Sequence, residues 1–204
     1  MNSTNGRIMH GARAYDLLVR LVTFGRERQL RETMIRLARI EPGEAVLDVG
    51  CGTGTLAIAA ARAVGPTGAV SGIDASPAMI ARAITKSRKA EVNVAFQHAV
   101  VEALPFPAAR FDVVLSTMML HHLPRTTRQQ CAAEIRRVLK PRGRVLVVDF
   151  GRAQQKHVVF AHLHRHGHVD FADVTAILTE RGLTPVDAGA VGFSSLRFVL
   201  ASAQ

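Results

Sequence analysis

Apolar residues recur along this chain with two different spacings. Over residues 12–24 and 27–39 they return every three or four positions, which places them on one face of a helix. From residue 45 onward, short apolar runs alternate with helical patterns. The runs lie at residues 45–47, 70–73, 92–96, 111–115 and 144–150, and helices are predicted over residues 54–64, 77–89, 126–139 and about 170–181. This alternation is typical of a parallel sheet covered by helices.

Two more strands are predicted near the end of the chain, at residues 185–190 and 196–201. The short connection between them favours an antiparallel pair, attached to a sheet that is otherwise parallel. The expected fold is therefore α/β: a Rossmann-like, seven-stranded, mostly parallel sheet with helices on both faces. Its last strand is antiparallel, and two helices precede it at the N-terminus.

Composition adds little beyond a globular class. Apolar residues make up 48% and charged residues 21% of the 204 residues, which are ordinary values. No apolar stretch reaches about 18 residues, so we expect no membrane-spanning helix. Residues 1–10 lack the apolar core of a secretory signal, which predicts a cytoplasmic protein. Cys51 and Cys131 are too few for a disulfide framework.

The formal net charge is +10, from 22 arginines and four lysines against 16 acidic residues. The basic residues are scattered, which weakens the case for nucleic acid. Two alternatives stay open. The charge could simply keep the surface solvated, or it could attract an anionic partner such as an acidic substrate, a phospholipid surface or RNA.

A glycine-rich stretch follows the first predicted strand and opens a helix. Gly50, Gly52 and Gly54 leave backbone amides accessible at the positive end of that helix. In the dinucleotide pattern G-x-G-x-x-G the third glycine comes one residue later, so this spacing argues against NAD. A turn that only connects strand and helix is the alternative.

Asp74 ends the next predicted strand, at the edge where open α/β sheets bind ligands. Its carboxylate could accept both hydroxyls of a ribose. Ser76 stands directly before Pro77 and is the better cap for the following helix. Asp74 is therefore expected to be left to a ligand.

Together these motifs resemble the class I S-adenosylmethionine-dependent methyltransferases, and within them the ubiquinone/menaquinone C-methyltransferase-like branch with its type 11 domain. The resemblance covers roughly residues 40–150. The matching stretches are 42–54, 72–76, 102–107, 111–114, 121–123 and 139–143.

The resemblance implies an enzyme that binds S-adenosylmethionine, with S-adenosylhomocysteine as product. Asp74 would hold the ribose, Ala75 and Met79 would flank the adenine, and Ser116 would face the methionine portion. Relatives often carry an acidic residue where this chain has Val100, so adenine would be held by apolar contact. The full set of implied cofactor contacts is Asp48, Gly50, Cys51, Gly52, Thr53, Gly54, Asp74, Ala75, Met79, Ala99, Val100, Val101 and Ser116.

The resemblance also implies one domain over residues 1–204. Residues 1–41 would form a helical cap, 42–150 the cofactor-binding core, and 151–204 a substrate-side segment with the final strands. Tyr15, Met118 and Met119 are the expected substrate-side residues.

The expected acceptor is a small molecule or a lipid, with peripheral membrane contact left open. Nucleic acid is disfavoured, because residues 116–119 read Ser-Thr-Met-Met where base-modifying relatives carry an Asn/Asp-Pro-Pro-aromatic motif. Two other classes stay open, an NAD-dependent oxidoreductase and a non-catalytic S-adenosylmethionine-binding protein.

His121 and His122 follow the fourth predicted strand and are candidate general bases. A recurrent family element without a catalytic role is the alternative. Five histidines crowd one later segment, but no cysteine or close carboxylate completes a ligand set, so no metal is expected. They are His157, His162, His164, His166 and His168.

Overall fold

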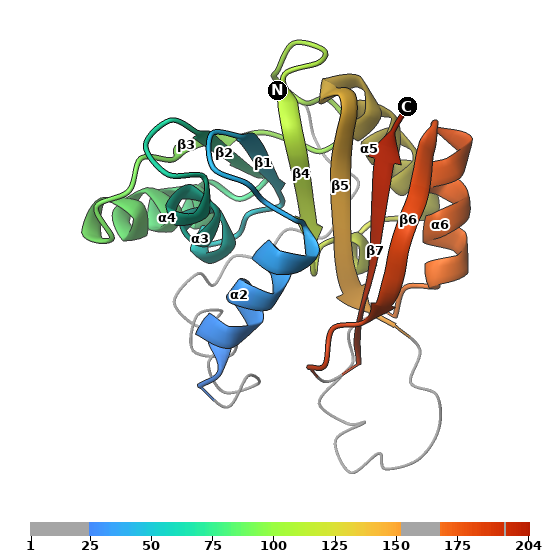
Figure 1. The fold of residues 1–204 in the computed structure, drawn as a ribbon, viewed down its shortest axis with the longest axis horizontal. Coiled ribbons are helices and arrows are strands. Elements are labelled where there is room, and N and C mark those ends of the chain that lie inside the picture. The colour runs from blue at the N-terminus through green and yellow to red at the C-terminus, as the bar shows by residue number, and fades with distance from the viewer. Residues whose placement is uncertain (1–24, 152–167, 194) are drawn as a thin grey trace.

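A computed structural model describes residues 25–151, 168–193 and 195–204, which form a sheet between layers of helices (Figure 1). The helices are α2 (Glu27–Leu37), α3 (Thr55–Val64), α4 (Pro77–Lys89), the 3-10 helix η1 (Leu120–His122), α5 (Arg125–Val138) and α6 (Phe171–Glu180). The strands are β1 (Ala45–Val49), β2 (Ala69–Asp74), β3 (Ala95–His98), β4 (Phe111–Thr117), β5 (Leu139–Phe150), β6 (Leu183–Ala190) and β7 (Leu196–Ala203). Within these ranges, no helix has both the length and the apolar character needed to cross a membrane.

The seven strands form one sheet in the order β3-β2-β1-β4-β5-β7-β6. Strands β1 to β5 pair in parallel, and β7 is antiparallel to both of its neighbours. This confirms the predicted fold class. The place of β7 between β5 and β6 was not part of the prediction, because chain order alone does not reveal which strand pairs with β5.

Most predicted elements appear with shifts at their ends, and β5 begins at Leu139 where the strand was predicted from residue 144. Helix α4 begins at Pro77, and Ser76 caps it by accepting a hydrogen bond from the Met79 amide at 3.4 Å. Strand β3 begins three residues later than expected, because Val92 still bonds back to the end of α4. The predicted helix over residues 12–24 lies outside the described residues.

Apolar side chains of the central strands point alternately to two cores. In β4, Val113 belongs to the core under α2 and α3, whereas Val114 belongs to the core under α5 and α6. Both side chains are fully buried. Coverage of both faces explains why the central strands read as continuous apolar runs.

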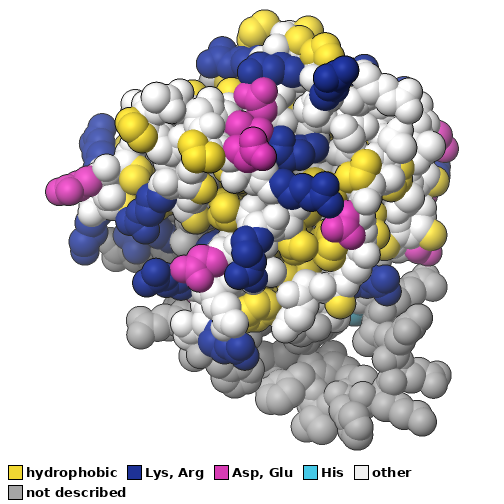
Figure 2. Space-filling model, viewed as in Figure 1, with side chains coloured by type: hydrophobic (Ala, Val, Ile, Leu, Met, Phe, Trp, Pro, Cys, Tyr) yellow, Lys and Arg dark blue, Asp and Glu magenta, His cyan; other side chains and the backbone are white. Residues whose placement is uncertain are grey.

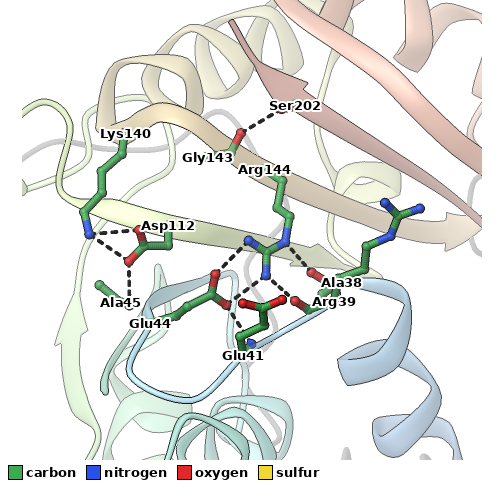
Figure 3. A network of polar contacts seen from close by, with 10 residues as sticks. All are labelled: Ala38, Arg39, Glu41, Glu44, Ala45, Asp112, Lys140, Gly143, Arg144 and Ser202. Carbon is green, nitrogen blue, oxygen red and sulfur yellow. Dashed lines mark hydrogen bonds and ion pairs between the residues drawn. The ribbon is translucent and has the colours of Figure 1, made fainter. Parts of the chain in front are cut away.

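Arg144 in β5 fastens the end of α2 to the sheet (Figure 3). Its guanidinium donates to both carboxylate oxygens of Glu44 at 2.8 Å, to the Ala38 carbonyl at 2.7 Å, and to the Arg39 carbonyl. Ala38 and Arg39 directly follow α2, where carbonyls have no helical partner, and Arg144 supplies one. This contact fixes where α2 lies over the sheet.

A second contact joins β1, β4 and β5 at the same edge (Figure 3). Lys140 donates to both carboxylate oxygens of Asp112, at 2.8 and 2.9 Å, and Asp112 accepts the Ala45 amide at 2.9 Å. These bonds lie where the parallel strands begin. The predicted site lies at the opposite edge, where the parallel strands end.

Candidate functional site

The glycine loop, residues 50–54, turns from the end of β1 into α3. Its three glycines have positive φ angles between 53° and 77°, a conformation that other residues adopt at a cost. A Cβ atom on Gly54 would lie 2.7 Å from the Phe96 ring and 2.8 Å from Ala83. The loop therefore packs directly on its neighbours, and Gly54 has no room for a side chain.

Two side chains of the loop are engaged within the protein. Lys86 of α4 donates to Thr53 Oγ1 at 3.0 Å and to Thr55 Oγ1 at 3.1 Å, so these bonds join the loop and the start of α3 to α4. Burial raises the pKa of the Cys51 thiol well above its ordinary value. Cys51 is therefore a neutral packing residue of the loop.

Asp74 links the glycine loop to the turn before α4. Its Oδ2 accepts the Gly52 amide at 2.9 Å, and its Oδ1 accepts the Ser76 amide at 2.8 Å. The expectation that Asp74 is left to a ligand was therefore incomplete, because these turn amides have no strand partner and use the carboxylate. A carboxylate has about four acceptor positions, so positions remain for ligand hydroxyls. Burial raises the pKa of Asp74, and the two amide bonds oppose that shift.

Asp48 and Arg31 are two buried residues of opposite charge beside the loop, and each has a polar atom without a hydrogen-bond partner. Asp48 Oδ2 and Arg31 Nε have no hydrogen-bond partner among the described residues, although their residues are only 2% and 7% exposed. Burial raises the pKa of Asp48 to about 7, and the positive charge of Arg31 opposes this. An unsatisfied buried polar group costs about 1–3 kcal/mol. A ligand that supplies a cationic donor and an anionic acceptor would remove both costs.

Arg31 was not among the predicted site residues. It lies on the same buried side of α2 as Leu30 and Met34, and its Nη2 bonds Glu27 at 3.1 Å. A charged residue on an otherwise apolar helix face was the available signal. The sequence could not show what that face would meet.

His121 and Asp149 form a second buried pair, at the ends of β4 and β5. His121 Nδ1 lies 2.7 Å from Asp149 Oδ1, and the two side chains are 3% and 1% exposed. The His121 amide also donates to Asp149 Oδ2 at 3.2 Å. A carboxylate on Nδ1 holds the orientation of the imidazole ring. The His122 ring lies 3.9 Å from the His121 ring, centroid to centroid.

Asp149 was also missed by the sequence reasoning. Its signal was its position at the end of a predicted parallel strand, where ligand-binding residues concentrate. Only the paired carboxylate and imidazole identify it as a site residue.

The two predicted substrate-side methionines occupy the turn after β4. Met118 has a φ of 51°, and its amide donates to the Val148 carbonyl at 2.7 Å. Met119 is buried against the glycine loop, since a Cβ on Gly50 would lie 2.5 Å from Met119 Cγ. Met119 therefore covers the loop in this structure, while the strained turn leads the chain toward His121.

The predicted adenine-side residues gather beside Asp74. The Ala99 amide donates to the Asp74 carbonyl at 3.2 Å, and Val100 and Val101 are buried. His98, another residue that the sequence reasoning missed, places Nε2 3.1 Å from the Ala75 carbonyl oxygen. Met79 lies in the first turn of α4 and is buried.

Ser116 lies at the end of β4, on the opposite face of the sheet from Asp48. It is 1% exposed, its Oγ has no partner among the described residues, and it lines a small apolar cavity of about 20 Å³ against α5 and α6. A larger groove of about 750 Å³ lies between α6 and β7, and it shares no residue with the glycine loop. The buried charged residues lie beside the glycine loop and not in this groove, so the loop is the candidate site.

Several predicted residues lie outside the described part of the chain. They are Tyr15, His157, His162, His164 and His166. His168 is described and exposed. Among the residues that the structure describes, no group of three histidine, cysteine or acidic side chains could hold a metal ion.

Comparison with known proteins gives these features a context. Residues 46–143 match the family described as a methyltransferase domain. The ubiquinone/menaquinone biosynthesis C-methyltransferase UbiE of Ralstonia pickettii (strain 12J) is 37% identical over 146 residues, which cover 71% of this chain and 58% of that protein. The chain thus spans less than two thirds of the length of that relative.

Solved structures share the fold at lower identity. A SAM-dependent methyltransferase from Aquifex aeolicus superposes with a TM-score of 0.76 at 23% identity, covering 96% of this chain and 100% of that one. The cyclase SpnF superposes with a TM-score of 0.73 at 18% identity, covering 86% of this chain and 80% of that one. At such identities the likeness concerns the fold, which is shared by proteins of different activity.

Proposed function

The chain belongs to the class I S-adenosylmethionine-dependent methyltransferases, and from this premise we propose that it transfers a methyl group from S-adenosylmethionine to a small-molecule acceptor. One observation carries the proposal, the unmatched buried pair of Asp48 Oδ2 and Arg31 Nε. The amino-acid part of this cofactor bears an ammonium and a carboxylate, which offer the donor and the acceptor that the pair lacks. A dinucleotide would instead bring a pyrophosphate to the glycine loop beside Asp48.

The remaining residues of the loop region fit the rest of the cofactor. The positive φ angles of Gly50, Gly52 and Gly54 hold the loop in a tight turn beside Asp74, which retains acceptor positions for ribose hydroxyls. Val100 and Val101 offer apolar surface to an adenine ring. The bound cofactor supplies an activated methyl group, so the protein has to align an acceptor and exclude water.

We further propose that the acceptor carries an ionisable hydroxyl, as in a phenol, an enol or a hydroquinone. His121 would accept the hydroxyl proton on Nε2, and Asp149 would hold the ring and stabilise the resulting imidazolium. Positioned general bases contribute about 10²–10⁴ in rate. The name of the R. pickettii relative refers to ubiquinone and menaquinone, so hydroquinones are the first acceptors to test.

The cellular location stays a prediction of this proposal. Cytoplasmic conditions suit the two cysteines, Cys51 and Cys131, which are both free and buried.

Calorimetry with S-adenosylmethionine, S-adenosylhomocysteine and NAD tests the cofactor directly. We expect binding of both sulfur ligands and none of NAD. Arg31→Met should weaken S-adenosylmethionine binding about tenfold to a hundredfold, because it removes a charged hydrogen-bond donor. Arg28→Met is the matched control, since Arg28 lies on the same helix and is 91% exposed.

A labelled-methyl screen against hydroquinones, phenols and enols tests the transfer. Product in this screen that disappears in His121→Gln would support the assigned base. Binding of S-adenosylmethionine with no product from any acceptor would favour the non-catalytic binding protein. Tight NAD binding without a response to either sulfur ligand would overturn the whole assignment.

A further inference from the structure

The end of the molecule where the parallel strands begin carries a small exposed surface of apolar and basic residues. We call it the basic tip, and its residues are Pro107, Ala108, Ala109, Arg110, Pro141 and Arg142, all exposed. The loop before β4 lies beside the junction of α5 and β5, because the Ala109 amide bonds the Arg137 carbonyl and the Arg110 amide bonds the Val138 carbonyl at the end of α5. This loop is at the top of Figure 1, and hydrophobic side chains stand beside dark blue ones there in Figure 2.

The charge of the basic tip is not balanced locally. Beneath it, Lys140 pairs with Asp112 and Arg137 pairs with Glu134. Within the described part of the chain, no carboxylate pairs with Arg110 or with Arg142. Asp112 and Glu134 are thus occupied by other cations, and the two exposed guanidinium groups can bind an anionic partner.

Two residues of the basic tip are also held in an unfavourable backbone conformation. Ala109 has a φ of 52° and Arg142 a φ of 62°. Turns use glycine, asparagine or aspartate at such positions, because these residues tolerate the left-handed region. Neither alanine nor arginine has that advantage. Arg39, Glu91 and Met118 share this conformation, so strain supports a role for Arg142 only together with its exposed, unbalanced charge.

We infer that the basic tip is a docking surface for a membrane rich in anionic phospholipid. Arg110 and Arg142 would bond headgroup phosphates, while the proline and alanine side chains would rest among the headgroups. Phe106 and Phe111 pack edge to face at 5.0 Å, with Arg110 over their rings. These aromatic rings are thus occupied and offer no stacking platform to single-stranded nucleic acid. The exposed proline and alanine side chains between the two arginines favour lipid over a duplex, which would meet only the charges.

Docking through this end has a geometric consequence. The glycine loop and the His121–Asp149 pair lie at the opposite edge of the sheet, where the parallel strands end. A protein bound by its basic tip would therefore turn its candidate site away from the bilayer. Its acceptor would arrive from the aqueous side, as a water-soluble hydroquinone or phenol would.

Co-sedimentation with vesicles tests the inference. The full chain is incubated with vesicles of 70% phosphatidylcholine and 30% phosphatidylglycerol, and with pure phosphatidylcholine, at low and high salt. We expect binding only to the anionic vesicles, and loss of it at high salt. Arg142→Gly should lower the partition coefficient about fivefold, and Arg110→Gln with Arg142→Gly about 25-fold.

Arg142→Gly has a second readout that separates docking from folding. Glycine relieves the positive φ, so this variant should melt at the same temperature as the parent or a few degrees higher while it binds vesicles less. Arg28→Ala is the control, since it removes the same charge from the first turn of α2. Its partition coefficient should change less than twofold.

Three results would overturn the inference. They are equal losses in Arg142→Gly and Arg28→Ala, equal binding to pure phosphatidylcholine, and displacement from the anionic vesicles by a short RNA or DNA duplex at lower concentration than by phosphatidylglycerol vesicles. The last result would assign the basic tip to nucleic acid. None of them bears on cofactor binding, which is measured separately.

Discussion

Replacing Asp74 with asparagine is expected to weaken both folding and cofactor binding. The carboxylate accepts the Gly52 and Ser76 amides at 2.9 and 2.8 Å, one on each oxygen. Asparagine has one oxygen, so one amide loses its acceptor at a cost of about 1–3 kcal/mol. For a chain of this size, each kcal/mol lowers the melting temperature by about 2–4 °C. We therefore expect the apo variant to melt roughly 2–12 °C below the parent.

The same substitution removes a charged acceptor for a ribose hydroxyl. Such a bond contributes about 1.5–3 kcal/mol, so the dissociation constant for S-adenosylmethionine should rise about tenfold to a hundredfold. The assay pairs melting curves of the apo protein with calorimetric titration at a temperature where the variant is folded.

Asp112→Asn is the matched control for Asp74→Asn. Asp112 also accepts a backbone amide, that of Ala45 at 2.9 Å, but it lies at the opposite edge of the sheet. This variant should lose stability and keep its cofactor affinity. An Asp74→Asn protein that binds S-adenosylmethionine within twofold of the parent would refute the ribose contact. Equal loss of affinity in both variants would show that general destabilisation explains the effect.

Three further predictions concern the loop and the two buried pairs. The pKa of Asp48 is about 7 when folded and 3.8 ordinarily, so the stability gained from its protonated form should fade as pH rises from about 4 through 7; denaturant titrations of Asp48→Asn should lack this slope, and an unchanged slope would count against the shift. Asp149→Asn should lower the methyl-transfer rate about 10²–10⁴-fold with S-adenosylmethionine affinity unchanged in calorimetry, whereas parallel loss of affinity and melting temperature would make Asp149 purely structural. Gly54→Ala places a Cβ 2.7 Å from the Phe96 ring and should cost about 1–3 kcal/mol more than Gly65→Ala, which also has positive φ but open space around it; equal melting temperatures would refute the clash.

Local patterns were sufficient for the elements of this fold. Helix α4 spans the predicted residues 77–89, because proline and a serine cap define its start within a few positions of sequence. The glycine loop was recognisable for the same reason, since a tight turn between strand and helix depends on its own residues. Both features depend on residues that are close together in the chain, so the sequence alone is enough to predict them.

Which residues far apart in the sequence come into contact depends on the tertiary structure. His121 and Asp149 are 28 positions apart, and they pair because β4 and β5 lie side by side and end at the same edge. Arg31 reaches the neighbourhood of Asp48 only because α2 packs across the sheet. Burial then raises the pKa of Asp48, which no local pattern encodes. The spacing of residues along a chain determines whether they form a helix or a strand, so the motifs could be recognised in the sequence. Contacts and desolvation depend on how whole elements pack, so the paired groups of the candidate site could not be predicted.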